Sequence, residues 1–126
     1  MNINYLLYSC SIFNIILVIF HLSFWKIFKW KETLAKGTKA NAIATQIMNI
    51  QLIIWFAIMA FIYLFYTKEL INTKLGNALL IGYALFWIIR FIQQFIFLKI
   101  KGSFVINLTI LFLLGAIIHT LPLFLI

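Results

Sequence analysis

Four long apolar runs take up most of the chain, and they constrain its fold more than any other feature. The runs cover residues 3–25, 43–66, 75–98 and 104–126. Each is close to the ~20 apolar residues that a helix needs to cross a hydrocarbon layer of ~30 Å. Only 10% of the residues are charged, whereas soluble domains carry about 25%. The sequence therefore predicts an all-α integral membrane protein, a single domain (residues 1–126) folded as a four-transmembrane-helix antiparallel bundle.

Lysines are divided unevenly among the three connections between the predicted spans. Seven lie in the first and third connections and two in the second. Because lysine-rich connections stay in the cytoplasm, this division predicts both termini on the outer side. The isoleucine-, asparagine- and lysine-rich composition is typical of bacterial proteins from AT-rich genomes. We therefore expect a multi-pass protein of the bacterial inner (cytoplasmic) membrane.

The lysines of the first and third connections also predict a surface for anionic lipid. A lysine beside the membrane is attracted to anionic headgroups by about 1 kcal/mol. No basic and aromatic face on a soluble module is evident, so nucleic acid is not an expected partner. We expect anionic lipids of the cytoplasmic leaflet to contact Lys26, Lys29, Lys31, Lys36, Lys39, Lys99 and Lys101.

Polar side chains of the predicted spans gather at a common depth. At about 1.5 Å of rise per residue, His21, Asn49 and Arg90 fall roughly 6–8 Å from the middle of their spans toward the cytoplasm. On three spans the polar residues are three, four or seven positions apart, so they form a stripe on one helix face. The stripe of the first span consists of Cys10, Asn14, His21 and Trp25, and that of the third span of Tyr83, Trp87, Arg90 and Gln94. We expect these faces to meet inside the bundle. The predicted ligand- or partner-binding residues are Arg90, His21, Asn49, Gln46, Gln93, Gln94, Asn107, Trp87 and Trp25.

Two interpretations of this polar layer remain open. Amides and histidine can join transmembrane helices by hydrogen bonds, and an arginine can extend toward the headgroups. Alternatively the layer lines a cytoplasm-facing cavity. Glu32 and Glu69 are the only acidic residues, and both lie in connections, so no carboxylate is expected within the spans beside Arg90. An arginine without a committed anion is a candidate receptor for a lipid phosphate, a carboxylated substrate or an acidic residue of another protein.

The sequence offers little support for a cofactor or a metal, and we expect neither. His21 and His119 are predicted at depths roughly 14 Å apart, too far to share one haem iron. A single histidine with a foreign ligand stays an alternative, as does an aromatic wall of Trp55 and Trp87 for a flat ligand such as a quinone. No HExxH motif, paired cysteine or glycine-rich phosphate loop is present.

Three functions follow from these observations. The first is a non-catalytic accessory subunit or binding protein that holds a partner protein or an anionic lipid through the polar layer around Arg90. The second is a small homo-oligomeric transporter or channel for an anionic or lipophilic solute, although the spans lack the acidic residues that proton-coupled carriers use. The third is a small membrane enzyme acting on a lipid or isoprenoid. No catalytic residues are assigned, because the serines have no carboxylate to orient a base.

Overall fold

Four long helices dominate the structure. A computed structural model describes all 126 residues and contains helices but no strands. The long helices are α1 (Ile3–Leu22), α4 (Lys39–Phe65), α6 (Lys74–Phe97) and α7 (Ser103–Thr120), which continues into the 3₁₀ turn η2 (Leu121–Phe124). All four are long and apolar enough to cross a membrane. The chain therefore has the make-up of a small multi-pass membrane protein, as the apolar runs predict.

Polar caps explain where three of these helices begin. The side chain of Asn2 accepts from the backbone N–H of Asn4, Thr38 accepts from Asn41, and Thr73 accepts from Gly76. Each cap satisfies a backbone N–H that has no partner within its own helix. The capped starts place α4 and α6 slightly earlier than the apolar runs alone predict, because a cap lies outside the hydrophobic stretch.

Short helical pieces fill the first two connections. Between α1 and α4 lie α2 (Phe24–Ile27), α3 (Trp30–Thr33) and the 3₁₀ turn η1 (Leu34–Lys36). Lys29 separates α2 from α3 with a left-handed φ of 48°. Between α4 and α6 lies α5 (Thr67–Asn72), and α6 starts so close to it that a Cβ at Gly76 would meet the backbone of Leu70.

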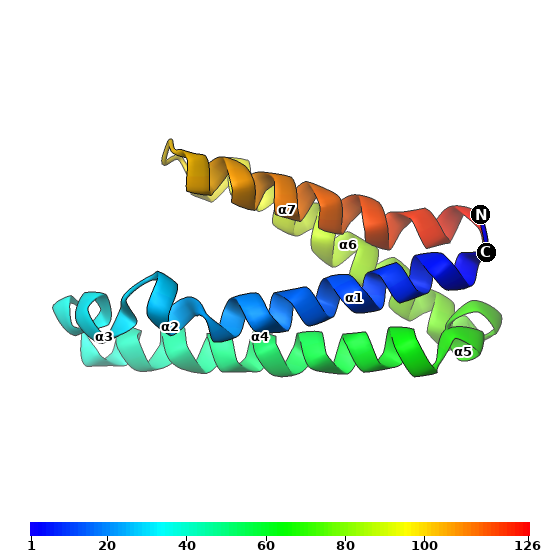
Figure 1. Cartoon of the computed structure of the whole chain (residues 1–126), viewed down its shortest axis with the longest axis horizontal. Helices are drawn as coiled ribbons and strands as arrows, with labels where there is room; N and C mark the ends of the chain where they lie inside the picture. The colour runs from blue at the N-terminus through cyan, green and yellow to red at the C-terminus, as the bar shows by residue number, and fades with distance from the viewer.

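The long helices pack as two pairs. Helix α1 packs along α4, and α6 packs along α7, and we call these pairs the first and second hairpin. Both chain termini lie at one end of the molecule, the termini end (Figure 1). At the opposite end, the lysine end, lie the first and third connections. The hairpins approach each other at the termini end and diverge toward the lysine end, as Figure 1 shows.

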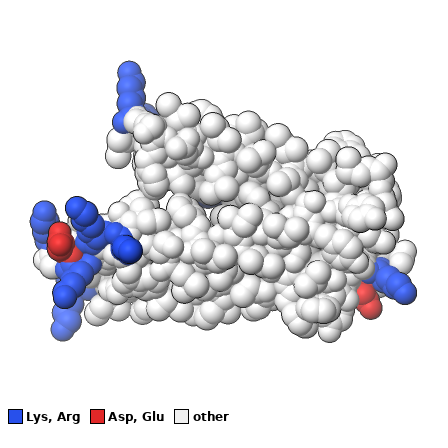
Figure 2. Space-filling model, in the orientation of Figure 1, with Lys and Arg blue, Asp and Glu red and all other residues white.

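Burial follows this divergence. The buried positions of α1 run from Leu7 to Leu17, and those of α7 from Phe112 to His119. Nearer the lysine end, both helices have only half-buried or exposed side chains. Charged groups lie at the two ends with an uncharged surface between them, and the surface is hollowed between the hairpins at the lysine end (Figure 2). The packed core thus occupies the termini half and the middle of the molecule.

Candidate functional site

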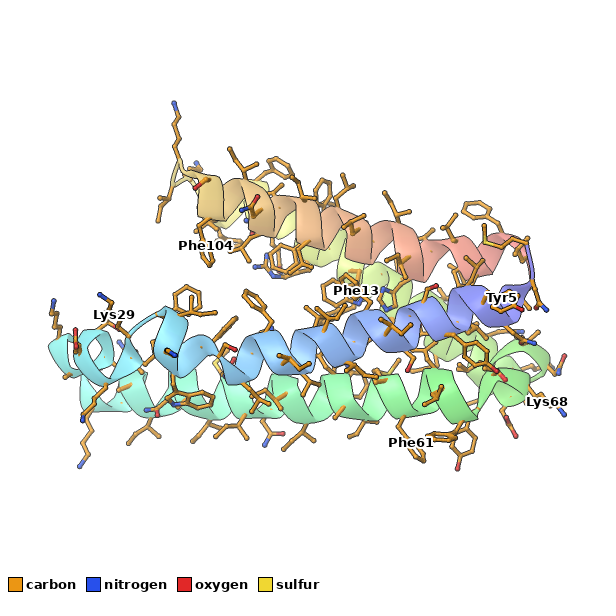
Figure 3. All side chains as sticks on the ribbon, in the orientation of Figure 1. Tyr5, Phe13, Lys29, Phe61, Lys68 and Phe104 are labelled. Atoms are coloured by element: carbon orange, nitrogen blue, oxygen red, sulfur yellow. The ribbon has the colours of Figure 1, made fainter.

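A cavity lies between the two hairpins where they diverge. Its volume is about 410 Å³, and all four long helices contribute to it. Side chains from both hairpins line this space, and Figure 3 shows Phe104 pointing from the start of α7 toward the first hairpin. The Phe28 and Phe104 rings contact each other between the hairpins, with their centroids 5.8 Å apart. We call this cavity the cleft, and its lining residues are Phe20, His21, Phe24, Phe28, Leu52, Phe56, Phe86, Trp87, Arg90, Leu108 and Phe112.

Arg90 brings a positive charge into the cleft without an acidic partner. Its guanidinium carbon lies 3.9 Å from the centroid of the Phe112 ring. Its Nη1 donates one long hydrogen bond, 3.4 Å, to Oε1 of Gln94. The remaining N–H groups of the guanidinium make no hydrogen bond within the chain. Glu32 and Glu69 are the only acidic residues, and acidic atoms appear only at the two ends of the molecule in Figure 2.

Gln94 is itself positioned by the neighbouring helix. Its Nε2 donates to the hydroxyl of Thr109 at 3.2 Å, and that hydroxyl donates to the carbonyl of Val105 at 2.8 Å. Gln94 is 3% exposed, so its amide is held between α6 and α7. The Arg90 guanidinium therefore contacts the neutral amide of Gln94 and the ring of Phe112. Neither of them carries a charge that would compensate the positive charge of Arg90.

His21 brings a hydrogen-bond acceptor to the same cleft. Its Nδ1 lies 2.8 Å from Oδ1 of Asn49, and Nδ2 of Asn49 donates to the His21 carbonyl at 3.0 Å. Since the amide nitrogen is used on that carbonyl, the amide oxygen faces the ring, and Nδ1 must carry the proton. The neutral ring then leaves Nε2 as a free acceptor. The cleft thus combines a cationic donor with a neutral acceptor.

A second cavity lies beside the first connection. It has a volume of about 520 Å³. Trp25 Nε1 donates to Oε1 of Gln46 at 3.0 Å, and Gln46 Nε2 donates to the Ala42 carbonyl at 3.1 Å, so this indole is fastened to α4. The cavity combines indoles and lysines in the way expected of a membrane interface. Its lining residues are Trp25, Trp30, Lys31, Leu34, Ala35, Gly37, Lys39, Ala42 and Gln46.

The structure brings together most, but not all, of the polar residues that the sequence groups. Arg90, His21 and Trp87 line the cleft, and Asn49 and Gln94 orient the first two. Trp25 and Gln46 belong to the second cavity instead. Two further residues, Gln93 and Asn107, are exposed and make no hydrogen bond within the chain. They are predicted in the same half of the spans as the others, but depth does not determine which way a side chain faces.

Sequence reasoning missed a second polar network, in the packed half of the molecule. Asn14 Nδ2 donates to the Cys10 carbonyl at 2.8 Å and to Nε2 of His119 at 3.1 Å. Tyr83 donates its hydroxyl to Oδ1 of Asn14, and His119 Nδ1 donates to the Gly115 carbonyl at 2.7 Å. Every polar atom of Asn14 and of the His119 ring therefore has a partner. Asn14 did lie on the predicted polar stripe of its span, and this was the available signal.

This network, which we call the Asn14 network, joins α1, α6 and α7. Asn14 and His119 are fully buried, and Tyr83 is 3% exposed. The two histidines of the chain thus belong to separate sites, His21 in the cleft and His119 in the core. No group of three or more His, Cys, Asp or Glu side chains is arranged to hold a metal ion. The Asn14 network is complete within the chain, whereas the cleft is not.

Comparison of the chain with protein-family models, curated proteins and solved structures finds no match. The fold and the cleft together define a class: a small protein with four helices able to cross a membrane, and a cleft between its two hairpins. Any more specific function must be inferred from the residues of the cleft.

Proposed function

We propose that the protein is a non-catalytic binding protein that holds an anionic amphiphile, such as an anionic phospholipid, in the cleft. Arg90 is the receptor for its acidic group. One observation carries this proposal: a guanidinium without any acidic partner lies on the wall of a cavity lined by aromatic rings.

The energetics of Arg90 favour an anion from outside the chain. An arginine at mid-membrane costs about 2.5–3.5 kcal/mol on insertion scales. A cation–π contact such as that with Phe112 offsets about 0.5–2 kcal/mol of this cost. The long bond to Gln94 is a weak addition. A phosphate or carboxylate accepting two parallel N–H bonds is the stronger complement to a guanidinium, because both partners are charged.

The rest of the cleft favours a ligand with an apolar body. Nine of its eleven lining residues are hydrophobic, so only one end of the ligand needs to be polar. An acyl chain fits such a cavity better than a partner helix, which is about 10–12 Å across with its side chains. The free acceptor on His21 suits a hydroxyl or a protonated phosphate oxygen on the same headgroup.

The lysine end supports the same proposal. Lys31 and Lys39 line the second cavity together with Trp25 and Trp30. Lysines and indoles at one depth concentrate anionic headgroups close to the mouth of the cleft. We propose that this end faces the cytoplasm of a bacterial cell and that both termini lie outside.

Cysteine labelling tests this orientation. Gly37→Cys introduces an exposed thiol at the lysine end, and Asn72→Cys introduces one at the termini end. The native Cys10 is fully buried and serves as an unreactive background. In spheroplasts, an impermeant maleimide should label Asn72→Cys and spare Gly37→Cys until the membrane is broken. The opposite pattern would overturn the orientation.

Native mass spectrometry tests the binding. Purified protein in mild detergent is titrated with phosphatidylglycerol or phosphatidylcholine carrying the same acyl chains. The wild type should retain phosphatidylglycerol preferentially. Arg90→Gln should weaken that retention by about tenfold or more, because a hydrogen bond to a charged group is worth about 1.5–3 kcal/mol. Lys68→Gln, an exposed charge at the termini end, should change little.

Two results would contradict the proposal. Equal retention of the two lipids by the wild type would show that charge plays no part. Unchanged preference in Arg90→Gln would show that the preference comes from the surface lysines and not from the cleft.

A further inference from the structure

The outward face of α4 carries an amide in the middle of the span. Gln51 is exposed and makes no hydrogen bond within the chain. It lies twelve residues from Lys39 and fifteen from Tyr66, which corresponds to about 18 Å and about 22 Å along a helix. The Gln51 side chain is too short to reach the lipid headgroups at either end of the helix. In a lone copy of the protein, the Gln51 amide would therefore face hydrocarbon.

The other amides in the long helices either make hydrogen bonds or lie near a helix end. Gln93 and Asn107 are also exposed without a hydrogen bond, but each lies only four residues from an end of its helix, about 6 Å along the axis. Asn14 and Asn49 are buried and fully engaged. Gln46 donates to the carbonyl four residues before it, which Gln51 does not do. Leaving an amide in an apolar medium without a hydrogen bond costs about 2–7 kcal/mol. Gln51 differs from Gln93 and Asn107 because it lies far from both ends of its helix, so its amide needs a partner at the same depth.

We propose that this face of α4 packs against the same face of a second copy of the chain, with the two Gln51 side chains hydrogen-bonded to each other. All copies of the chain insert into the membrane with the same orientation. A two-fold axis that relates two such copies must therefore run along the membrane normal. Around such an axis each residue meets its own copy at its own depth. A glutamine amide has both donors and an acceptor, so it complements itself.

The surrounding residues suit a helix pair. Exposed residues repeat along α4 with alternating spacings of three and four, the pattern of a seam between two helices. A single polar residue in such a seam sets the register and the number of chains. The face opposite this seam packs on α1, so pairing through α4 leaves the cleft open. The seam consists of Ala44, Ile47, Gln51, Ile54 and Ile58.

Cross-linking tests the interface directly. Gln51→Cys places a thiol on the proposed axis, and Ile50→Cys places one at nearly the same depth but about 100° around the helix. Ile50 is also exposed, 43%, so both thiols are accessible. In liposomes treated with a mild oxidant, Gln51→Cys should give the disulfide-linked dimer at least severalfold faster than Ile50→Cys. Equal rates, or none, would overturn the proposed face.

Dimerisation in liposomes of phosphatidylcholine provides the second measurement. Single-molecule photobleaching should show two-step bleaching for the wild type at low protein density. Gln51→Leu should weaken the association by about threefold to tenfold, because interhelical hydrogen bonds in membranes are modest. Gln93→Leu, the same change at an exposed glutamine of α6, should have no effect. A monomeric wild type at every density would refute the proposal. Arg90→Gln should still dimerise, which separates this interface from the lipid site.

Discussion

The polar side chains around Asn14 and those around Arg90 differ in how far they satisfy one another within the chain. In the packed half, Asn14, Tyr83 and His119 satisfy one another, and three helices are joined. In the half that opens at the lysine end, Arg90 and His21 are oriented by neighbouring amides but keep free donors and a free acceptor. Similar residue types therefore produce a helix junction in one place and an open cleft in the other. The difference lies in whether the network is complete within the chain.

Side-chain size explains why the hairpins meet in one half and separate in the other. At Gly115, α7 lies against Trp87 of its own hairpin and against Phe13 of the first hairpin. A Cβ there would be 2.8 Å from Trp87 Cε3 and 3.0 Å from Phe13 Cζ. The cleft has no comparable small residue at its centre. Phenylalanine rings from both hairpins line it instead, and such rings prevent the backbones from approaching closely.

The largest expected effect comes from breaking the Asn14 network. Asn14→Leu keeps the approximate volume but leaves the Tyr83 hydroxyl and Nε2 of His119 without their partner. Each unsatisfied buried group costs about 1–3 kcal/mol, less where a new partner can be found. We expect the free energy of unfolding to fall by about 3 kcal/mol in an SDS titration from mixed micelles. The control, Asn107→Leu, changes an exposed asparagine of α7 and should leave the midpoint unchanged.

A somewhat smaller loss is expected from filling the contact at Gly115. Gly115→Ala forces the Trp87 and Phe13 rings to move, and overpacking of this kind costs about 1–3 kcal/mol. The same change at Gly82, where nothing lies within 4 Å of the added Cβ, should be neutral or stabilising by up to about 1 kcal/mol. Thermal unfolding followed by circular dichroism distinguishes the two variants. Equal midpoints would mean that the close packing of α7 is not what holds the hairpins together.

The amide behind His21 should matter less for stability than Asn14. Asn49→Leu removes two hydrogen bonds between α1 and α4, and such bonds average about 0.6 kcal/mol in membranes. We expect a loss of about 1 kcal/mol in the same SDS titration, together with weaker retention of phosphatidylglycerol because the His21 ring is no longer oriented. A loss as large as that of Asn14→Leu would contradict the distinction between the two halves.

The smallest change in stability is expected at Arg90 itself. Arg90→Met removes a charge that has no countercharge within the chain, so the unfolding free energy without lipid should stay within about 1 kcal/mol of the wild type or rise. Added phosphatidylglycerol should then raise the unfolding midpoint of the wild type but not that of the variant. Strong destabilisation of the lipid-free variant would instead identify Arg90 as a structural residue.

Much of the candidate site could be anticipated from helix periodicity. Asn14, His21 and Trp25 share one predicted stripe, as do Trp87, Arg90 and Gln94, and the structure turns residues of both stripes toward the space between helices. Gln93 and Asn107 show the limit of that reasoning. Gln93 lies about 100° around the helix from Gln94, and which of the two faces inward depends on how α6 is rotated against α7. The pairing of Asn14 with His119 joins residues 105 positions apart, and no local pattern encodes such a contact.

The sequence by itself determined the four spans, because length and hydrophobicity are properties of each segment alone and lipid is the solvent they require. It also determined that Arg90 would lack a countercharge, since the only two carboxylates lie in connections. Only the tertiary structure decided which polar groups complete one another and which stay open. Which groups meet depends on the distance between the hairpins. That distance is short where Gly115 allows a close contact and longer where bulky rings line the cleft. Interhelical distance is a property of packed pairs, and no single segment contains it.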